Sequence, residues 1–109
     1  MKKIMKAGYH MVVEIIRYDI APETAQQFIT AYTEAGTYLD RSTHCLSYEV
    51  IKGIEEANHF IVRIEWDSME GHMQGFRTSS DFQHFFSLVK PFFNAILEMK
   101  HYSVIANSR

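Results

Sequence analysis

Cysteine and proline are scarce in this chain of 109 residues, which contains one Cys and two Pro. Because Cys45 is alone, no disulfide can form within the chain, and a small disulfide-held fold is excluded. No Pro-rich, Gly-rich or repetitive stretch interrupts the sequence, and its length is that of one domain. We therefore predict a single domain, residues 1–109, with its core at about residues 10–106.

Long apolar runs and an excess of one charge are also missing. No run approaches the length of a membrane span, and Lys6, His10 and Glu14 interrupt any apolar segment that could act as a secretory signal. The net charge is −2, with Lys and Arg scattered along the chain, which argues against binding of nucleic-acid phosphates. We expect a cytoplasmic protein without membrane or nucleic-acid partners.

Aromatic residues, by contrast, are abundant: eight Phe, six Tyr and one Trp. This is more aromatic surface than one small core needs, so part of it is expected to line a pocket or an interface.

The spacing of apolar residues predicts strand, helix, strand, strand, helix and strand, in that order. Ser80 and Gln83 have the spacing of a capping box, and Pro91 should kink the second helix. Asp67 and Ser68 offer a cap for an additional short helix. The expected elements are residues 11–20, 22–40, 44–52, 59–66, 80–97 and 101–106.

This order is the split pattern of the ferredoxin-like α+β fold, in which two helices cover one face of a four-stranded antiparallel sheet. The covered face is expected to carry Leu46, Tyr48, Val50, Phe60, Val62, Ile64 and Trp66. The opposite face is expected to carry apolar residues beside charged ones: Val13, Ile15, Ile51, Ile61 and Ile105 with Glu49, Arg63 and Glu65. Such a face suits a homodimer paired sheet to sheet, and the alternative is a monomer with a partly apolar sheet.

No spacing typical of a metal site or of a phosphate-binding loop occurs. His44 and Cys45 are neighbours on a strand and should point to opposite faces, so they cannot easily share an ion. Cys45 has no evident partner base and is expected to be a buried, inert thiol. We therefore expect neither a metal nor another cofactor.

The segment from residue 60 to residue 102 contains a Trp that ends a strand, a His, Gly-Phe-Arg, Ser-x-x-Phe, Pro-Phe and His-Tyr. In this sequence these are Trp66, His72, Gly75-Phe76-Arg77, Ser79-x-x-Phe82, Pro91-Phe92 and His101-Tyr102. The pattern resembles the antibiotic biosynthesis monooxygenase family. The resemblance implies a dimeric α+β barrel that oxygenates aromatic or quinol-like substrates without metal or flavin. Many family members have two His residues where this chain has Phe76 and Asp81, so roles of those His residues cannot be transferred.

A cofactor-free oxygenase needs a base that removes a proton from the substrate, because the resulting anion itself reduces oxygen. His72 is our first candidate for this base, near Trp66 at the mouth of the expected pocket, and a solvent-facing His72 is the alternative. Glu14 and His101 are left open as further candidates. Arg77 could hold a substrate oxygen, or could form a surface ion pair with Glu70 or Asp81. Trp66 is the second candidate catalytic residue and, with other aromatic residues, an expected wall of the pocket, although these residues could equally be simple core. The expected aromatic walls are Tyr32, Tyr48, Trp66, Phe76, Phe82 and Phe86.

Three functions remain open at this point. The first is a cofactor-independent monooxygenase acting on a small aromatic or quinol-like substrate. The second is a non-catalytic dimer that binds a small apolar ligand in the same pocket. The third is haem degradation, because haem-degrading relatives of the family use a Trp near the end of the third strand together with an Asn and a His. Trp66 matches that Trp, but the first strand, residues 11–20, contains no Asn, and the axial His has no clear counterpart. A weak isomerase is a further alternative.

Overall fold

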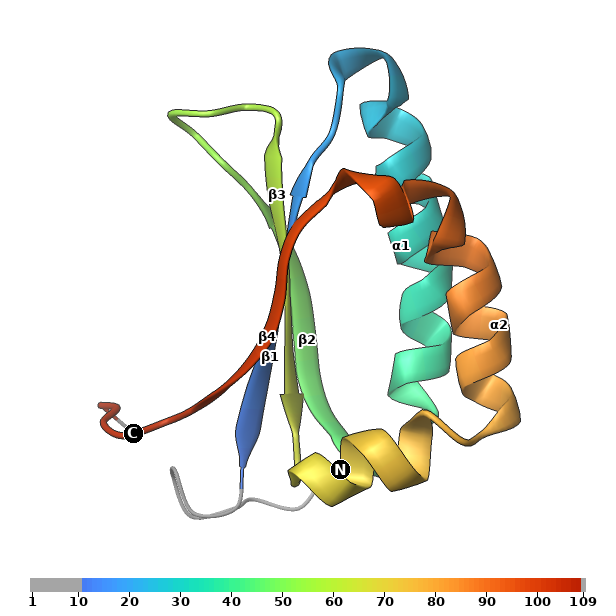
Figure 1. Ribbon diagram of the computed structural model, residues 1–109, viewed down its shortest axis with the longest axis vertical. Helices are drawn as coiled ribbons and strands as arrows, with labels where there is room; N and C mark the ends of the chain where they lie inside the picture. Colours follow the sequence, from blue (N-terminus) through green and yellow to red (C-terminus); the bar gives the residue numbers. More distant parts are fainter. Residues whose placement is uncertain (1–10, 109) are drawn as a thin grey trace.

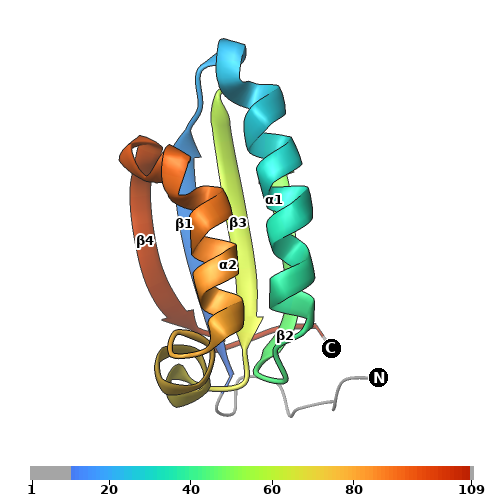
Figure 2. The same ribbon diagram turned by 90° about the vertical axis from the view of Figure 1, so that its right-hand side faces the viewer.

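The computed structural model describes residues 11–108. Lys6 and His10, two of the residues that argue against a secretory signal, lie outside the described residues. Four strands form one antiparallel sheet in the order β2-β3-β1-β4. Both α-helices pack on the same face of this sheet (Figures 1 and 2). The ferredoxin-like fold is thereby confirmed. The elements are β1 (Val12–Asp19), α1 (Ala25–Asp40), β2 (Cys45–Lys52), β3 (His59–Trp66), α2 (Ser80–Val89) and β4 (Ile96–Ser103).

Helix α1 follows a 3-10 turn, Pro22–Thr24, in which the missing N–H of proline costs no helical hydrogen bond. Its buried residues recur every three or four positions, so they form one stripe that faces the sheet. The buried stripe consists of Phe28, Tyr32, Ala35, Gly36 and Leu39.

Within residues 11–108, no helix has the length and apolar character needed to cross a membrane.

Strand β3 alternates as its sequence predicts, with every second side chain almost completely buried against the helices. Strand β2 departs from the prediction because its pairing with β3 shifts between Cys45 and Ser47. This bulge gives β2 one extra residue, so the side chains before it point to the opposite faces from those that strict alternation along β2 predicts. Cys45, opposite Trp66, therefore enters the core, whereas Leu46 is only half-buried and does not belong to the core cluster.

The carboxyl-terminal part also differs from the prediction. Helix α2 ends at Val89 and is followed by a 3-10 segment, Lys90–Ala95, with Pro91 in its first turn. Proline lacks an N–H donor and its ring crowds the preceding turn, so the α-helix stops rather than kinking. Strand β4 consequently begins at Ile96 and ends at Ser103, and the predicted limits of 101–106 are wrong. Ile105 lies beyond the strand and is 94 % exposed, so it is not part of the sheet face.

Two serines cap the helices that follow β3. Ser68 accepts a hydrogen bond from the amide N–H of Gly71 at 2.9 Å, which confirms the predicted cap. The segment Gly71–Phe76 then forms a π-helix, closed by a bond from the Arg77 N–H to the His72 carbonyl. Helix α2 is capped by Ser79, whose Oγ accepts from the Phe82 N–H, and not by Ser80 as the capping-box spacing suggested.

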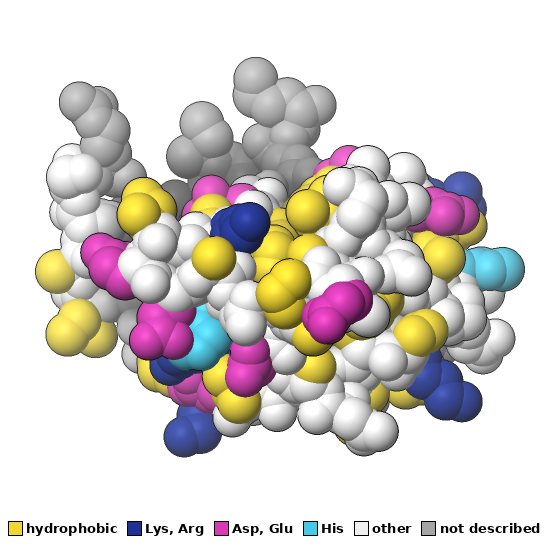
Figure 3. All heavy atoms as spheres, turned by 90° about the horizontal axis from the view of Figure 1, so that it is seen from above, with side chains coloured by type: hydrophobic (Ala, Val, Ile, Leu, Met, Phe, Trp, Pro, Cys, Tyr) yellow, Lys and Arg dark blue, Asp and Glu magenta, His cyan; other side chains and the backbone are white. Residues whose placement is uncertain are grey.

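The face of the sheet away from the helices carries both apolar and charged side chains. Val13 and Ile15 of β1 lie opposite Glu65 and Arg63 of β3, and Arg63 forms an ion pair with Glu65 at 2.7 Å. We call this surface the open sheet face. Seen from above in Figure 3, basic and acidic side chains are interspersed around the hydrophobic ones and form no basic stripe on the side shown.

Candidate active site

A cavity of about 300 Å³ lies between the sheet and the helices. Its walls come from β1, α1, β3, the π-helix, α2, the 3-10 segment and β4, so residues from the whole length of the described chain meet there. Seven of the eight residues that the sequence suggested for the site line it: Tyr32, Trp66, His72, Phe76, Arg77, Phe82 and Phe86.

Tyr48 is the exception, and the expectation that it borders this cavity is wrong. It lies against Gly36 of α1, so closely that a Cβ at position 36 would collide with the tyrosine ring. Tyr48 lines a separate hollow, together with Ile29 and Val50. The absence of a side chain at Gly36 leaves the space that the Tyr48 ring occupies against α1.

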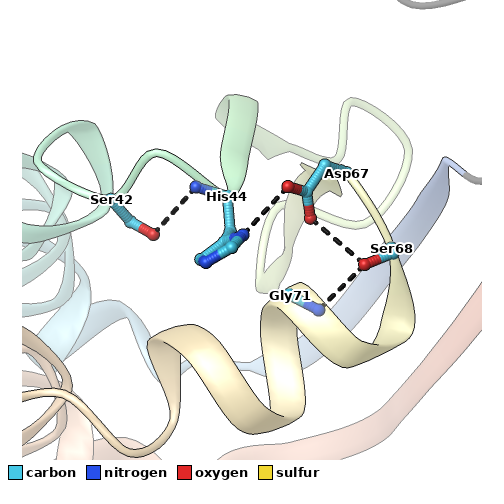
Figure 4. A network of polar contacts seen from close by, with 5 residues as sticks. All are labelled: Ser42, His44, Asp67, Ser68 and Gly71. Atoms are coloured by element: carbon cyan, nitrogen blue, oxygen red, sulfur yellow. Dashed lines mark hydrogen bonds and ion pairs between the residues drawn. The ribbon is translucent and has the colours of Figure 1, made fainter.

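The π-helix crosses the lower end of the gap between sheet and helices in Figure 1 and carries His72 into the cavity wall. Figure 4 shows how its start is fixed to β2 and β3. His44 Nδ1 lies 2.9 Å from the Asp67 carboxylate, and Asp67 accepts a hydrogen bond from Ser68. The imidazole of His44 fits against Gly71 and Gly75, where a Cβ would collide with it. His72, one residue after Gly71, is consequently only 3 % exposed.

Trp66 holds two polar side chains in place. Its indole ring stacks on the His72 imidazole, with ring centroids 4.2 Å apart and planes 7° from parallel. Its Nε1–H donates a hydrogen bond of 3.0 Å to Glu14 Oε1. Glu14 is 4 % exposed, because it projects from β1 to the helix side of the sheet.

His101 of β4 completes this polar group. Its Nε2 lies 2.8 Å from His72 Nδ1, so one of the two imidazoles donates a hydrogen bond to the other. The other nitrogen of His72, Nε2, lies 3.6 Å from Glu14 Oε1. We call Glu14, His72 and His101 the polar triad. Its members come from β1, the π-helix and β4, and Glu14 and His101 are register partners in the sheet.

Burial shifts the pKa of each member of the polar triad in the direction that favours its uncharged form. The pKa of Glu14 is raised by desolvation, against which the hydrogen bond from Trp66 and the charge of Arg77 act. The pKa of His72 is lowered to about 4 by desolvation, then by His101 and Arg77. Burial and Arg77 also lower the pKa of His101. These shifts favour the neutral form of both imidazoles, and a neutral imidazole can accept a proton.

Two tyrosines form a second polar contact in the wall of the cavity. The hydroxyls of Tyr18 and Tyr32 share a hydrogen bond of 2.6 Å, and both side chains are buried. Desolvation raises the pKa of Tyr18 to about 12 and raises that of Tyr32 as well. Sequence reasoning did not select Tyr18. The alternation of β1, which puts Tyr18 on the same face as Glu14, was the signal that could have found it.

Arg77 lies at the edge of the cavity, with its guanidinium 5.0 Å from the centre of the Phe82 ring. Asp81, one of the two partners considered for a surface ion pair, instead pairs with Arg41 at 3.1 Å. Arg77 therefore keeps a positive charge close enough to the polar triad to affect the pKa values of all three members.

The sequence profile of the antibiotic biosynthesis monooxygenase family matches residues 11–88. The chain belongs to this family. An uncharacterised protein of Bacillus subtilis (strain 168), YczJ, is 26 % identical over 92 residues, which are 84 % of this chain and 97 % of YczJ. The matched residues include β1, the π-helix and almost all of α2, the elements that supply most of the cavity wall.

Solved structures of other proteins share the fold. A protein of Bordetella bronchiseptica assigned as an antibiotic biosynthesis monooxygenase has a TM-score of 0.74 at 22 % identity, covering 90 % of this chain and 100 % of its own. SnoaB, a cofactor-independent oxygenase from Streptomyces nogalater, has a TM-score of 0.69 at 10 % identity, covering 93 % and 97 %. At these identities the likeness extends to the fold alone.

Proposed function

We propose that this protein is a cofactor-independent monooxygenase that oxidises a small aromatic or quinol-like substrate with O₂. The observation that carries the proposal is the position of His72, a buried imidazole in the wall of an aromatic cavity with a carboxylate beside it. Family membership and the fold shared with a cofactor-independent oxygenase support the same reaction class.

His72 is the proposed proton acceptor. In the tautomer with its proton on Nδ1, that N–H donates to His101, and Nε2 is left to accept a proton. The carboxylate of Glu14, 3.6 Å away, then stabilises the imidazolium that forms. These contacts support the proposed roles of His72 as the base and of Glu14 as the negative charge beside its protonated form.

The oxidation itself follows from deprotonation of the substrate. An acidic CH₂ group gives a carbanion, which donates its electrons to O₂ and forms a C–O bond as a peroxide anion. The peroxide anion takes back the proton from His72, and loss of water leaves a carbonyl. One oxygen atom enters the product and the other leaves as water, so the reaction needs no external reductant. Aromatic walls and exclusion of water favour such an anion by holding its ring in place.

The test is oxygen uptake by the metal-free protein with anthrones, dihydroxynaphthalenes and quinols. The proposal expects uptake above the spontaneous rate, and a fall of about 10²-fold or more in His72→Gln. His84→Gln is the matched control, because His84 is an exposed histidine on α2. Uptake that is equal in both variants would remove His72 as the base, and no uptake with any of these substrates would count against the oxygenase.

A non-catalytic role is the second candidate, and the lining of the cavity favours it. Most of that lining is aromatic or aliphatic, as in sites that bind small apolar ligands. Such a protein would bind the same aromatic compounds without consuming oxygen. Calorimetric binding of an anthrone, with no uptake above the spontaneous rate, would favour this function over the first.

We also infer that the protein is a homodimer paired through the open sheet face. The support is the composition of this face, where Ile51 is 45 % exposed and Ile15 and Ile61 are half-buried beside charged residues. A second copy would remove these side chains from water and bring charges of opposite sign together.

A further inference from the structure

We propose that Glu14, His72 and His101 form a binding site for one divalent transition-metal ion of the zinc and iron class. One ligand atom from each of the three side chains lies within 4.8 Å of the others, and Glu14 and His72 are buried. Two imidazoles and one carboxylate form a common set of protein ligands for such ions. The inference rests on this geometry and does not depend on the proposed oxygenase.

The donor atoms select the class of ion. Imidazole nitrogen binds Zn²⁺, Fe²⁺ and Co²⁺ well, whereas Mg²⁺ and Ca²⁺ prefer sites made only of oxygen. Bonds of about 2.1 Å hold the ligand atoms of one ion roughly 3 to 3.5 Å apart. Ligand atoms that lie as much as 4.8 Å apart must approach by roughly 1.3 to 1.8 Å to meet this requirement, and rotation of the half-exposed His101 side chain would supply this movement.

Groups around the triad already support two of the ligands. The Nε1–H of Trp66 fixes one oxygen of Glu14, and the stacked indole fixes the plane of the His72 ring. Contacts of this kind orient metal ligands in characterised sites. Glu14 and His72 also border the cavity, so a ligand from solution could complete the coordination.

Metal binding and proton acceptance exclude each other at His72, because both use a lone pair of the same imidazole. A bound ion would therefore inhibit a metal-free oxygenase. Binding is measured without any substrate, so its outcome is independent of the oxygen-uptake experiment.

The test is titration of the metal-free protein with Co²⁺, followed by visible absorption, and with Zn²⁺, followed by calorimetry. We expect one ion per chain and an absorption spectrum of Co²⁺ bound to nitrogen and oxygen. Glu14→Gln and His101→Gln should each weaken binding by about tenfold or more. Glu14→Gln keeps an oxygen acceptor for Trp66, and His101 is half-exposed, so both variants should fold.

His84→Gln removes an exposed histidine from α2 and should leave the affinity unchanged. Equal affinity in wild type, Glu14→Gln and His101→Gln would overturn the proposal. So would a stoichiometry well below one ion per chain at Co²⁺ and Zn²⁺ concentrations that saturate surface histidines. Circular dichroism of each variant separates loss of a ligand from loss of the fold.

Discussion

Individual buried polar residues determine the character of the cavity more than its aromatic walls do. Glu14, His72, Tyr18 and Tyr32 are each withdrawn from water, and each has a hydrogen-bond or ion-pair partner among the others or in Trp66. Because a buried polar group is stable only while its partner remains, changes at single atoms here should have large effects.

Trp66→Phe should destabilise the protein by about 2 to 4 kcal/mol. It removes buried volume and also the N–H donor of Glu14, whose carboxylate would then lie in the cavity without that bond. Urea unfolding measures the change. Phe76→Leu is the control, since Phe76 contacts Trp66 but makes no hydrogen bond through its ring. A smaller loss in Trp66→Phe than in this control would mean that the bond to Glu14 contributes nothing.

Alkaline pH should destabilise the protein through Tyr18. Its pKa is raised to about 12 in the folded state, against 10 for the ordinary side chain, so above pH 10 the unfolded chain loses its proton first. The free energy of unfolding is unaffected below about pH 10 and declines as the pH rises from there toward 12, by about 2 to 3 kcal/mol at most. Urea unfolding between about pH 8 and 11 follows this decline. Tyr18→Phe should show a shallower decline, and an unchanged slope would contradict the assignment.

At the scale of the elements, the π-helix is positioned by contacts that lie outside the cavity. His44 precedes β2, Asp67 follows β3, and the contact between His44 Nδ1 and the Asp67 carboxylate fixes the start of the helix that carries His72 (Figure 4). Both side chains are about one third exposed, so the pair is partly screened by water.

His44→Ala should lower the free energy of unfolding by up to about 1 kcal/mol. It should also lower the affinity of the cavity for an aromatic ligand, because the π-helix loses its attachment to β2. Thermal unfolding and calorimetry measure the two effects. His59→Ala, which breaks a comparable pair with Glu56 in the β2–β3 connection, should affect binding much less. Equal effects on binding would show that the attachment is unimportant for the cavity.

The sequence predicts most elements but fewer of their limits. Alternation in β3 and helical spacing in α1 are local patterns, and both are confirmed because burial follows them. The helical spacing of Phe93, Ile96 and Leu97 was misleading, since these residues pass from the 3-10 segment into β4 after Pro91 ends the helix. The bulge at Cys45 depends on the pairing of two strands, and one strand alone does not reveal it.

The site was predictable in its parts and not in its assembly. Trp66 and His72 lie close together in the sequence, so their proximity could be expected. The contact between His72 and His101 depends on the register of β4 against β1, which pairs Glu14 with His101. No pattern along the chain encodes that register, and the wrong limits of the last strand concealed it.

At the scale of the whole molecule, the open sheet face is the face of the sheet that neither α-helix of residues 11–108 covers. Both α-helices lie on the other side of the sheet (Figure 1). In the strand register, the hydrophobic residues of the open sheet face are separated by charged ones. An isolated chain leaves Ile51 exposed and Ile15 and Ile61 partly exposed, whereas a pair of chains would enclose them.

Ile61→Glu should convert the proposed dimer into monomers. The new carboxylate would be buried at the centre of the interface, at a cost of several kcal/mol. Light scattering after size exclusion should give twice the 12.7 kDa chain mass for wild type and the single chain mass for the variant. Ile54→Glu is the control, because Ile54 is 92 % exposed in the β2–β3 connection. A monomeric wild type would refute the dimer.

The stacking of Trp66 on His72 also provides an optical reporter. Trp66 is the one tryptophan of the sequence, so the intrinsic fluorescence of the protein comes chiefly from an indole in contact with the triad. A protonated imidazole or a bound Co²⁺ ion at van der Waals distance quenches an excited indole. Emission intensity should therefore follow the occupancy of the site directly, in unlabelled protein and before any substrate is known.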